Sequence, residues 1–286
     1  MIRKTLPVLI GTLLSSTLAF ADVSLEIKGL DGALEDNVDA YLSAIPEEEY
    51  SISLRFQSRL ESMIKEALNA LGYYQPVITF THSEDDTELT VTVESGEPVI
   101  IYASDIVLTG EAKDDPDFLA LIAKSKLSKG SILNHGNYDS LKSSIRNLGL
   151  AKGYFDGAYD LSKLEVAPEL NRAYVRLHYN SGIRYHFGTT LVTGSQIEED
   201  KVQSLKPFKD GEPYSITKVG EYNQNLSNTD WFSSVFVEPD LSQLGEGREI
   251  PMKVSLAPPK IRRISKNWGD KHLLRRSYVA LNARHE

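Results

Sequence analysis

A unit of about eighty residues occurs three times in this chain, and this internal repeat limits the possible folds more than any other feature. Three glycines, Gly29, Gly110 and Gly194, each end a run of strand-type residues and stand 81 and 84 residues apart. Two more, Gly96 in "VESGEP" and Gly182 in "YNSGIR", end the first two units. Landmarks that recur in one order with one period predict three copies of the same structural module.

A second landmark in each unit places two aromatic residues next to a helix-ending residue. The stretches are "LGYYQP" from 71, "KGYFDG" from 152 and "TDWFSS" from 229. Glycine ends helices because its left-handed conformation is unstrained, and aspartate takes its place in the third stretch. We predict that each aromatic pair fills the core between a helix and the following strand, and a ligand site is the less favoured interpretation. The structural corner residues are Gly72, Tyr73, Tyr74, Gly153, Tyr154, Phe155, Trp231 and Phe232.

Apolar residues at helical spacing predict two helices between the first and second strands of each unit. In the first unit they fall within residues 34–45 and 56–71. In the second unit Asp115 and Pro116 have the residue types of a helix start. In the third unit Ser195 and Glu198 have capping-box spacing, which predicts a helix beginning at Ser195.

Strict alternation of apolar and polar residues predicts the last strand of each unit, most clearly at 173–179 and 250–256. The fold class is therefore expected to be α+β, with three tandem β-α-α-β-β domains. Each domain would be a three-stranded mixed sheet covered by two helices. In chain order, the predicted domains are 22–97, 98–182 and 183–258.

The first 21 residues have the pattern of a secretory signal peptide. Arg3 and Lys4 precede a short apolar region, and "AFA" offers small residues at the cleavage site, so Asp22 is the expected first mature residue. A membrane helix is the less favoured interpretation, because the apolar segment is shorter than the roughly 20 residues that a span requires. The chain has no cysteine, so this exported protein must be stabilised by ordinary cores and not by disulfides.

The residues offer no recognisable catalytic or cofactor chemistry. The six histidines lack metal-ligand spacing, no nucleophile motif occurs, and the acidic runs fall at a predicted turn and a helix start. The formal net charge of −9 argues against nucleic acid as a partner. We therefore expect no enzyme, no cofactor, no metal site and no small-molecule substrate.

The repeat with its aromatic corners resembles the POTRA domains of outer-membrane assembly factors in the BamA/TamA superfamily. The resemblance is strongest to the TamA family of translocation and assembly module subunits, which have three POTRA domains. It covers residues 1 to about 258 and includes three stretches, which are 67–76, 179–188 and 205–214. The individual corners are weakly specific, whereas their number and order are strong.

The resemblance implies a periplasmic region of an outer-membrane protein assembly factor, located at the periplasmic side of the outer membrane. Its implied partners are a TamB-like protein anchored in the inner membrane and autotransporter or β-barrel clients awaiting insertion. Two alternatives remain open. The chain could be a free periplasmic chaperone or interaction module, or a fragment of a two-partner secretion type transporter, although such transporters usually have two POTRA domains.

By analogy with POTRA folds, the second strand of each module is expected to lie at an exposed edge, where an extended client can add by main-chain hydrogen bonding. The predicted partner-binding residues are Val77, Ile78, Thr79, Phe80, Ala158, Tyr159, Leu161, Val235, Phe236 and Val237.

The C-terminal segment departs from the family pattern. Members of the family continue into a membrane β-barrel, whereas residues 259–286 form a basic tail without the alternating segments of barrel strands. The expectation is that this chain lacks the barrel and can stay soluble in the periplasm. A disrupted gene is the favoured explanation; an adapted tail and an artificial truncation are the others.

Overall fold

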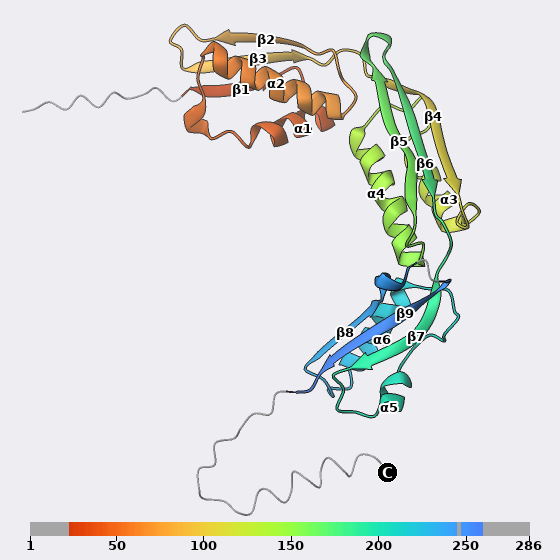
Figure 1. The fold of residues 1–286 in the computed structure, drawn as a ribbon. Coiled ribbons are helices and arrows are strands. Elements are labelled where there is room, and N and C mark those ends of the chain that lie inside the picture. Colours follow the sequence, from red (N-terminus) through yellow and green to blue (C-terminus); the bar gives the residue numbers. More distant parts are fainter. Residues whose placement is uncertain (1–22, 245–246, 260–286) are drawn as a thin grey trace, which may run out of the picture. The chain divides into compact units, whose positions relative to one another are not determined.

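The computed structural model describes residues 23–244 and 247–259, and within these ranges nine strands form three separate sheets (Figure 1). The predicted signal peptide and residues 260–286 of the predicted basic tail lie outside the described residues. Each sheet has its third strand in the centre, in the orders β1-β3-β2, β4-β6-β5 and β7-β9-β8. The first strand is parallel to the central strand and the second is antiparallel to it. The predicted α+β class with three mixed sheets is confirmed.

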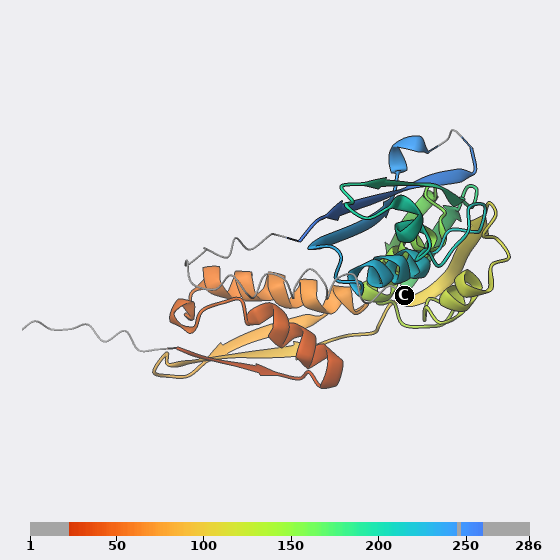
Figure 2. The same cartoon turned by 90° about the horizontal axis from the view of Figure 1, so that it is seen from below.

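The first domain contains two helices that pack against its sheet (Figure 2). Its core joins Leu60 and Ile64 of the second helix to Val91 of the central strand, all fully buried. Each such side chain contributes about 1.5–3 kcal/mol through burial. The elements are β1 (Ser24–Lys28), α1 (Gly32–Leu42), the 3-10 turn η1 (Glu47–Glu49), α2 (Leu54–Ala70), β2 (Val77–His82) and β3 (Glu88–Glu94).

The second domain follows the same order, and its first helix starts as predicted. Asp115 is the N-cap, and its Oδ1 accepts a hydrogen bond of 3.0 Å from the backbone N–H of Asp117. Pro116 occupies the first turn, where a missing N–H costs nothing. The elements are β4 (Ile100–Thr109), α3 (Pro116–Ala123), α4 (His135–Lys152), β5 (Ala158–Ala167), the 3-10 turn η2 (Pro168–Leu170) and β6 (Arg172–Asn180).

The third domain has the same topology with a shorter first helix. The predicted capping box at Ser195 is wrong, because the helix begins only after Glu198. Ser195 Oγ instead accepts from the N–H of Ile197 at 3.0 Å, which closes a local turn before the helix. The elements are β7 (His186–Thr193), α5 (Glu199–Gln203), α6 (Ile216–Ser227), β8 (Ser234–Pro239), the 3-10 turn η3 (Leu241–Gln243) and β9 (Glu249–Ala257).

The glycines that follow the first strands are required by backbone geometry. Gly29 has φ +92°, and an added Cβ would lie 2.3 Å from the carbonyl oxygen of Val93. Gly194 has φ +75°, and its Cβ would lie 2.1 Å from the carbonyl oxygen of Leu256. A side chain at either position would strain the backbone and collide with the neighbouring strand, which explains why the repeat retains glycine there.

By its internal contacts the chain divides into two compact units, one ending at Arg184 and the other starting at Tyr185. The first unit holds the first two domains, which are joined by a hydrogen bond of 2.8 Å from Val99 N–H to the carbonyl of Gly72. Each predicted domain range contains one complete sheet, and the domain boundaries themselves stay predictions.

Candidate partner-binding edges

The second strand of each domain lies at an outer position of its sheet. All ten residues predicted to bind partners fall in these strands: Val77–Phe80 in β2, Ala158, Tyr159 and Leu161 in β5, and Val235–Val237 in β8. The strands are thus edges in the sense the sequence anticipated, and their use in binding remains a prediction.

In β2, Ile78 and Phe80 have backbone groups at the open edge and side chains that pack on the core. Ser83 N–H donates to the carbonyl of Glu88 at 3.0 Å, so Ser83 and Glu88 belong to the hydrogen-bonded pairs of the antiparallel ladder. Because bonded and non-bonded pairs alternate along such a ladder, Ile78 and Phe80 direct their N–H and C=O groups outward. The side chains of these two residues pack on the core, whereas Val77 is 58% exposed.

In β8 the residues whose backbone groups face the open edge are not the residue whose side chain is most exposed. Asp240 N–H donates to the carbonyl of Pro251 at 2.7 Å, so Val235 and Val237 direct their backbone groups to the open edge. The Phe236 side chain is 56% exposed, but the Phe236 N–H points to the central strand. The outward N–H of Val235 is therefore the better target for testing this edge.

The edge strand β5 contains a residue that belongs to the core. Tyr159 Oη donates to the carbonyl of Lys142 at 2.9 Å, and its ring lies 5.1 Å from that of Tyr179. Burial, followed by the neighbouring Tyr179, raises the pKa of Tyr159. The register shifts between Tyr159 and Leu161, so the core-facing positions of the strand change from odd-numbered at Tyr159 to even-numbered at Leu164. Tyr159 thus holds β5 against α4.

Sequence reasoning missed a second outer strand in each domain, although the starts of β4 and β7 are hydrogen-bonded there to residues 130–133 and 211–214. The first strands, β1, β4 and β7, occupy the other outer position of each sheet. The order of elements contained a signal for this arrangement. Two helices separate the first strand from the other two, and they supply the crossover that the first strand needs to pair in parallel with the third. A central third strand therefore leaves both the first and the second strand at edges.

At the three corners the backbone conformation is shared, although the residue is not. Gly72, Gly153 and Asp230 all have positive φ, at 94°, 89° and 57°. In the second domain Gly153 is the left-handed C-cap of α4, and Tyr154 N–H bonds back to the carbonyl of Gly149 at 2.9 Å. The left-handed turn reverses the chain at the end of the helix.

The aromatic residues of each corner are buried unequally. In the second domain Tyr154 is 3% exposed, with its ring 5.8 Å from that of Phe118, while Phe155 is half-buried. In the third domain the second member, Phe232, is buried and Trp231 is half-buried. In the first domain both Tyr73 and Tyr74 are half-buried, and Tyr74 Oη lies 2.5 Å from His135 Nε2 of the second domain.

A charged clamp joins the two helices of the second domain beside its corner. Lys152 Nζ donates to both carboxylate oxygens of Asp115, at 2.6 and 2.7 Å, and to Asp117 Oδ2 at 2.6 Å. Burial acts to lower the pKa of Lys152, but the hydrogen bonds to the two carboxylates outweigh it and raise that pKa. The same contact lowers the pKa of Asp117. The clamp ties the start of α3 to the end of α4.

Neither a metal cluster nor a membrane-length helix is found in residues 23–244 and 247–259. No group of three or more His, Cys, Asp or Glu side chains is placed there to hold a metal ion. No helix within these ranges is long and apolar enough to cross a membrane.

Residues 24–95 match a family model described as POTRA domain TamA domain 1, and this range spans β1 to β3. The first domain is therefore a POTRA domain, and the other two share its strand order.

Similar solved structures include BamA POTRA domains 3–5 of Haemophilus influenzae, at 15% identity with 82% of this chain and 95% of that chain covered and a TM-score of 0.46. POTRA domains 1–3 of Omp85 from Anabaena match at 13% identity over 84% and 95% of the two chains, with a TM-score of 0.33. CdiB from Escherichia coli matches at 13% identity over 74% and 36%, also with a TM-score of 0.33.

Proposed function

We propose that this chain is the periplasmic region of a TamA-like outer-membrane protein assembly factor that binds unfolded clients and guides them toward insertion. The observation that carries the proposal is the repeated open edge, with one antiparallel edge strand in each of three sheets. The match of residues 24–95 to the first POTRA domain of TamA supports this role.

The proposed binding mode is strand addition. An autotransporter or β-barrel client emerging in the periplasm is extended, and it carries unpaired backbone groups along its length. An open edge can satisfy those groups without reading much sequence, which suits a factor that handles many clients. The function is scaffolding without catalysis, performed at the periplasmic side of the outer membrane, and a TamB-like protein is the proposed partner at the first domain.

Proline substitution at outward-facing edge positions tests this mode. Ile78→Pro and Val235→Pro each remove one N–H from an open edge without removing a bond of the ladder. Ile78→Ala is the matched control, because it shortens the side chain but keeps the N–H. We expect weaker binding of a barrel-strand peptide by each proline variant and near-normal binding by the alanine variant.

The measurement is peptide binding by fluorescence anisotropy, with circular dichroism establishing that each variant is folded. Equal binding by folded proline variants and wild type would overturn the edge mode and direct the search to the helical faces. Tyr159 and Phe236 are unsuitable targets, since proline there would disturb the core of the second domain and the ladder of β8 respectively.

A further inference from the structure

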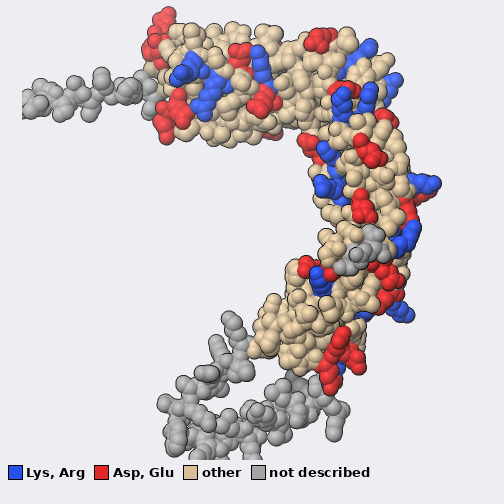
Figure 3. Space-filling model, in the orientation of Figure 1, with Lys and Arg blue, Asp and Glu red and all other residues tan. Residues whose placement is uncertain are grey.

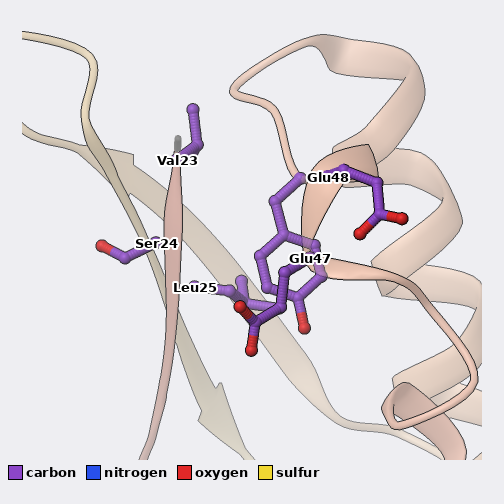
Figure 4. A pocket seen from close by; sticks show the side chains of 6 residues that line it. Val23, Ser24, Leu25, Glu47 and Glu48 are labelled. Carbon is purple, nitrogen blue, oxygen red and sulfur yellow. The ribbon is translucent and has the colours of Figure 1, made fainter. Parts of the chain in front are cut away.

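Two grooves lie at equivalent places in the first and second domains, each between the edge of the first strand and the segment after the first helix. The first-domain groove, of about 520 Å³, is lined by Val23, Ser24, Leu25, Glu47, Glu48 and Tyr50. Figure 4 shows Ser24 and Leu25 projecting to opposite sides of β1, with Leu25 toward the turn that carries Glu47 and Glu48.

The second-domain groove, of about 790 Å³, is lined on one side by β4 residues that include Ser104 and Ile106. Its other side carries three exposed lysines, Lys124, Lys126 and Lys129. Leu25 and Ile106 each stand four residues before the glycine that ends their strand, so the two grooves share an equivalent strand position. The first-domain groove therefore carries carboxylates, whereas the second-domain groove carries ammonium groups.

The backbone of β1 is available to an added strand. Ser24 N–H donates to the carbonyl of Thr87 at 2.9 Å, which sets the phase of the parallel pairing with β3. The next residues alternate, so Leu25 and Ile27 direct their N–H and C=O groups to the open edge. A strand that bonds to these groups would send alternate side chains toward the groove.

The charges at the first-domain groove are uncompensated. Glu49 pairs with Arg59 at 2.6 Å, whereas Glu47 and Glu48 are exposed and form no ion pair with the other described residues. Residues 22–97 carry 17 Asp or Glu against 4 Lys or Arg, and residues 98–182 carry 10 of each. In Figure 3 acidic side chains gather at the end of the first domain where the described chain begins.

We infer that the first-domain groove binds an extended segment of a partner protein that adds to the edge of β1 and carries Lys or Arg at alternate positions. The aliphatic stems of these side chains contact Val23 and Tyr50, and their charged ends meet Glu47 and Glu48. The inference deepens the proposed function, because it specifies basic side chains at alternate positions of one partner. It rests on the proposed function only for which protein that partner is. It uses β1, whereas client binding uses β2.

The test uses the mature full chain and a synthetic strand peptide with alternating Lys and Val, alongside the same peptide with Glu in place of Lys. Glu47→Gln/Glu48→Gln removes the two groove charges. Glu35→Gln/Asp36→Asn is the matched control, because it removes two exposed charges of α1 outside the groove. We expect the groove variant to bind the Lys peptide about tenfold more weakly at low salt, the effect of losing two exposed ion pairs.

The control variant should bind nearly as wild type, and the Glu peptide should not bind. Hydrogen exchange should show new protection at Leu25 and Ile27. Equal losses in both double variants would reduce the effect to net charge and overturn the inference, as would protection confined to β2 or to the second-domain groove.

Ile78→Pro separates this inference from the proposed function. That variant should leave Lys-peptide binding unchanged while weakening binding of the barrel-strand peptide. If barrel-strand binding survives Ile78→Pro but the Lys peptide still protects β1, the proposed client mode fails and the inference stands.

Discussion

The corners of the second and third domains solve one backbone problem with different residues. Both reverse the chain through a left-handed residue, but Gly153 is buried and Asp230 is exposed. A buried position leaves little room for a side chain, whereas an exposed one lets aspartate, which tolerates this conformation better than most residues, direct its carboxylate to solvent. The lesson is that the repeat preserves a dihedral angle, and burial decides which residues can supply it.

The difference extends to the aromatic that fills each core. In the second domain it is the first residue after the turn, Tyr154, and in the third it is the second, Phe232. The second domain also braces its corner with the ion pairs of Lys152. The equivalent Thr229 forms neutral hydrogen bonds instead: its hydroxyl donates to the carbonyl of Leu226 at 2.7 Å and accepts from the N–H of Trp231 at 3.2 Å. Three substitution series test how far these differences matter.

The largest effect is expected for Tyr154→Ala. Truncating this buried ring should cost about 3–5 kcal/mol of the unfolding free energy of the second domain, because it leaves a cavity beside Phe118. Trp231→Ala, at a half-buried ring, should cost less than half as much. Urea unfolding, monitored by hydrogen exchange, assigns each loss of unfolding free energy to its domain. Tyr154→Phe keeps the ring and should stay within about 1 kcal/mol of wild type. Equal costs for Tyr154→Ala and Trp231→Ala would contradict the unequal burial.

A smaller effect is expected for Lys152→Met. It leaves the nearly buried carboxylate of Asp115 without its cation and should cost about 1–3 kcal/mol near neutral pH. Thr229→Val, at the equivalent place in the third domain, should cost less.

The pH dependence of the Lys152→Met effect follows from two pKa shifts of opposite sign. The lowered pKa of Asp117 makes its contribution present above about pH 4 and lost as pH falls through the folded value. The raised pKa of Lys152 makes its contribution present below about pH 10 and lost as pH rises through the folded value. Unfolding at a series of pH values should show the difference between wild type and variant shrinking at both extremes. A difference that stays constant below pH 3 would mean that packing, and not charge, is what the clamp supplies.

The smallest effects concern the turn residues themselves. Gly153→Ala should cost about 1–2 kcal/mol, since a Cβ is strained at φ +89°. Asp230→Gly should change stability by less than about 1 kcal/mol, because relief of strain is offset by the greater freedom of glycine in the unfolded chain. Thermal unfolding monitored by circular dichroism resolves the two. If Gly153→Ala is as stable as wild type, the buried turn has room that its burial does not suggest.

The sequence was sufficient for features that depend on short-range chemistry. The helix start at Asp115 and the left-handed corner at Gly153 follow from which backbone conformations a residue allows. The alternation in β6 and β9 follows from one face of a sheet being buried. These local rules, repeated three times, were enough to fix the number of sheets and the order of elements.

The tertiary structure decided what depends on residues distant in sequence. The capping-box spacing at Ser195 did not start a helix, because a local turn competed with it. Which aromatic of each corner is buried depends on the rings it meets across the core, as Tyr154 meets Phe118. Nor could composition alone place Glu47 opposite Leu25, or Lys126 opposite Ile106, since a groove is formed only when a strand edge and a distant turn come together. The sequence by itself determined the repeated module, because its signals are local. The fold alone decided that the first strands also lie at edges and which charges face the groove beside each, because both depend on pairing across the chain.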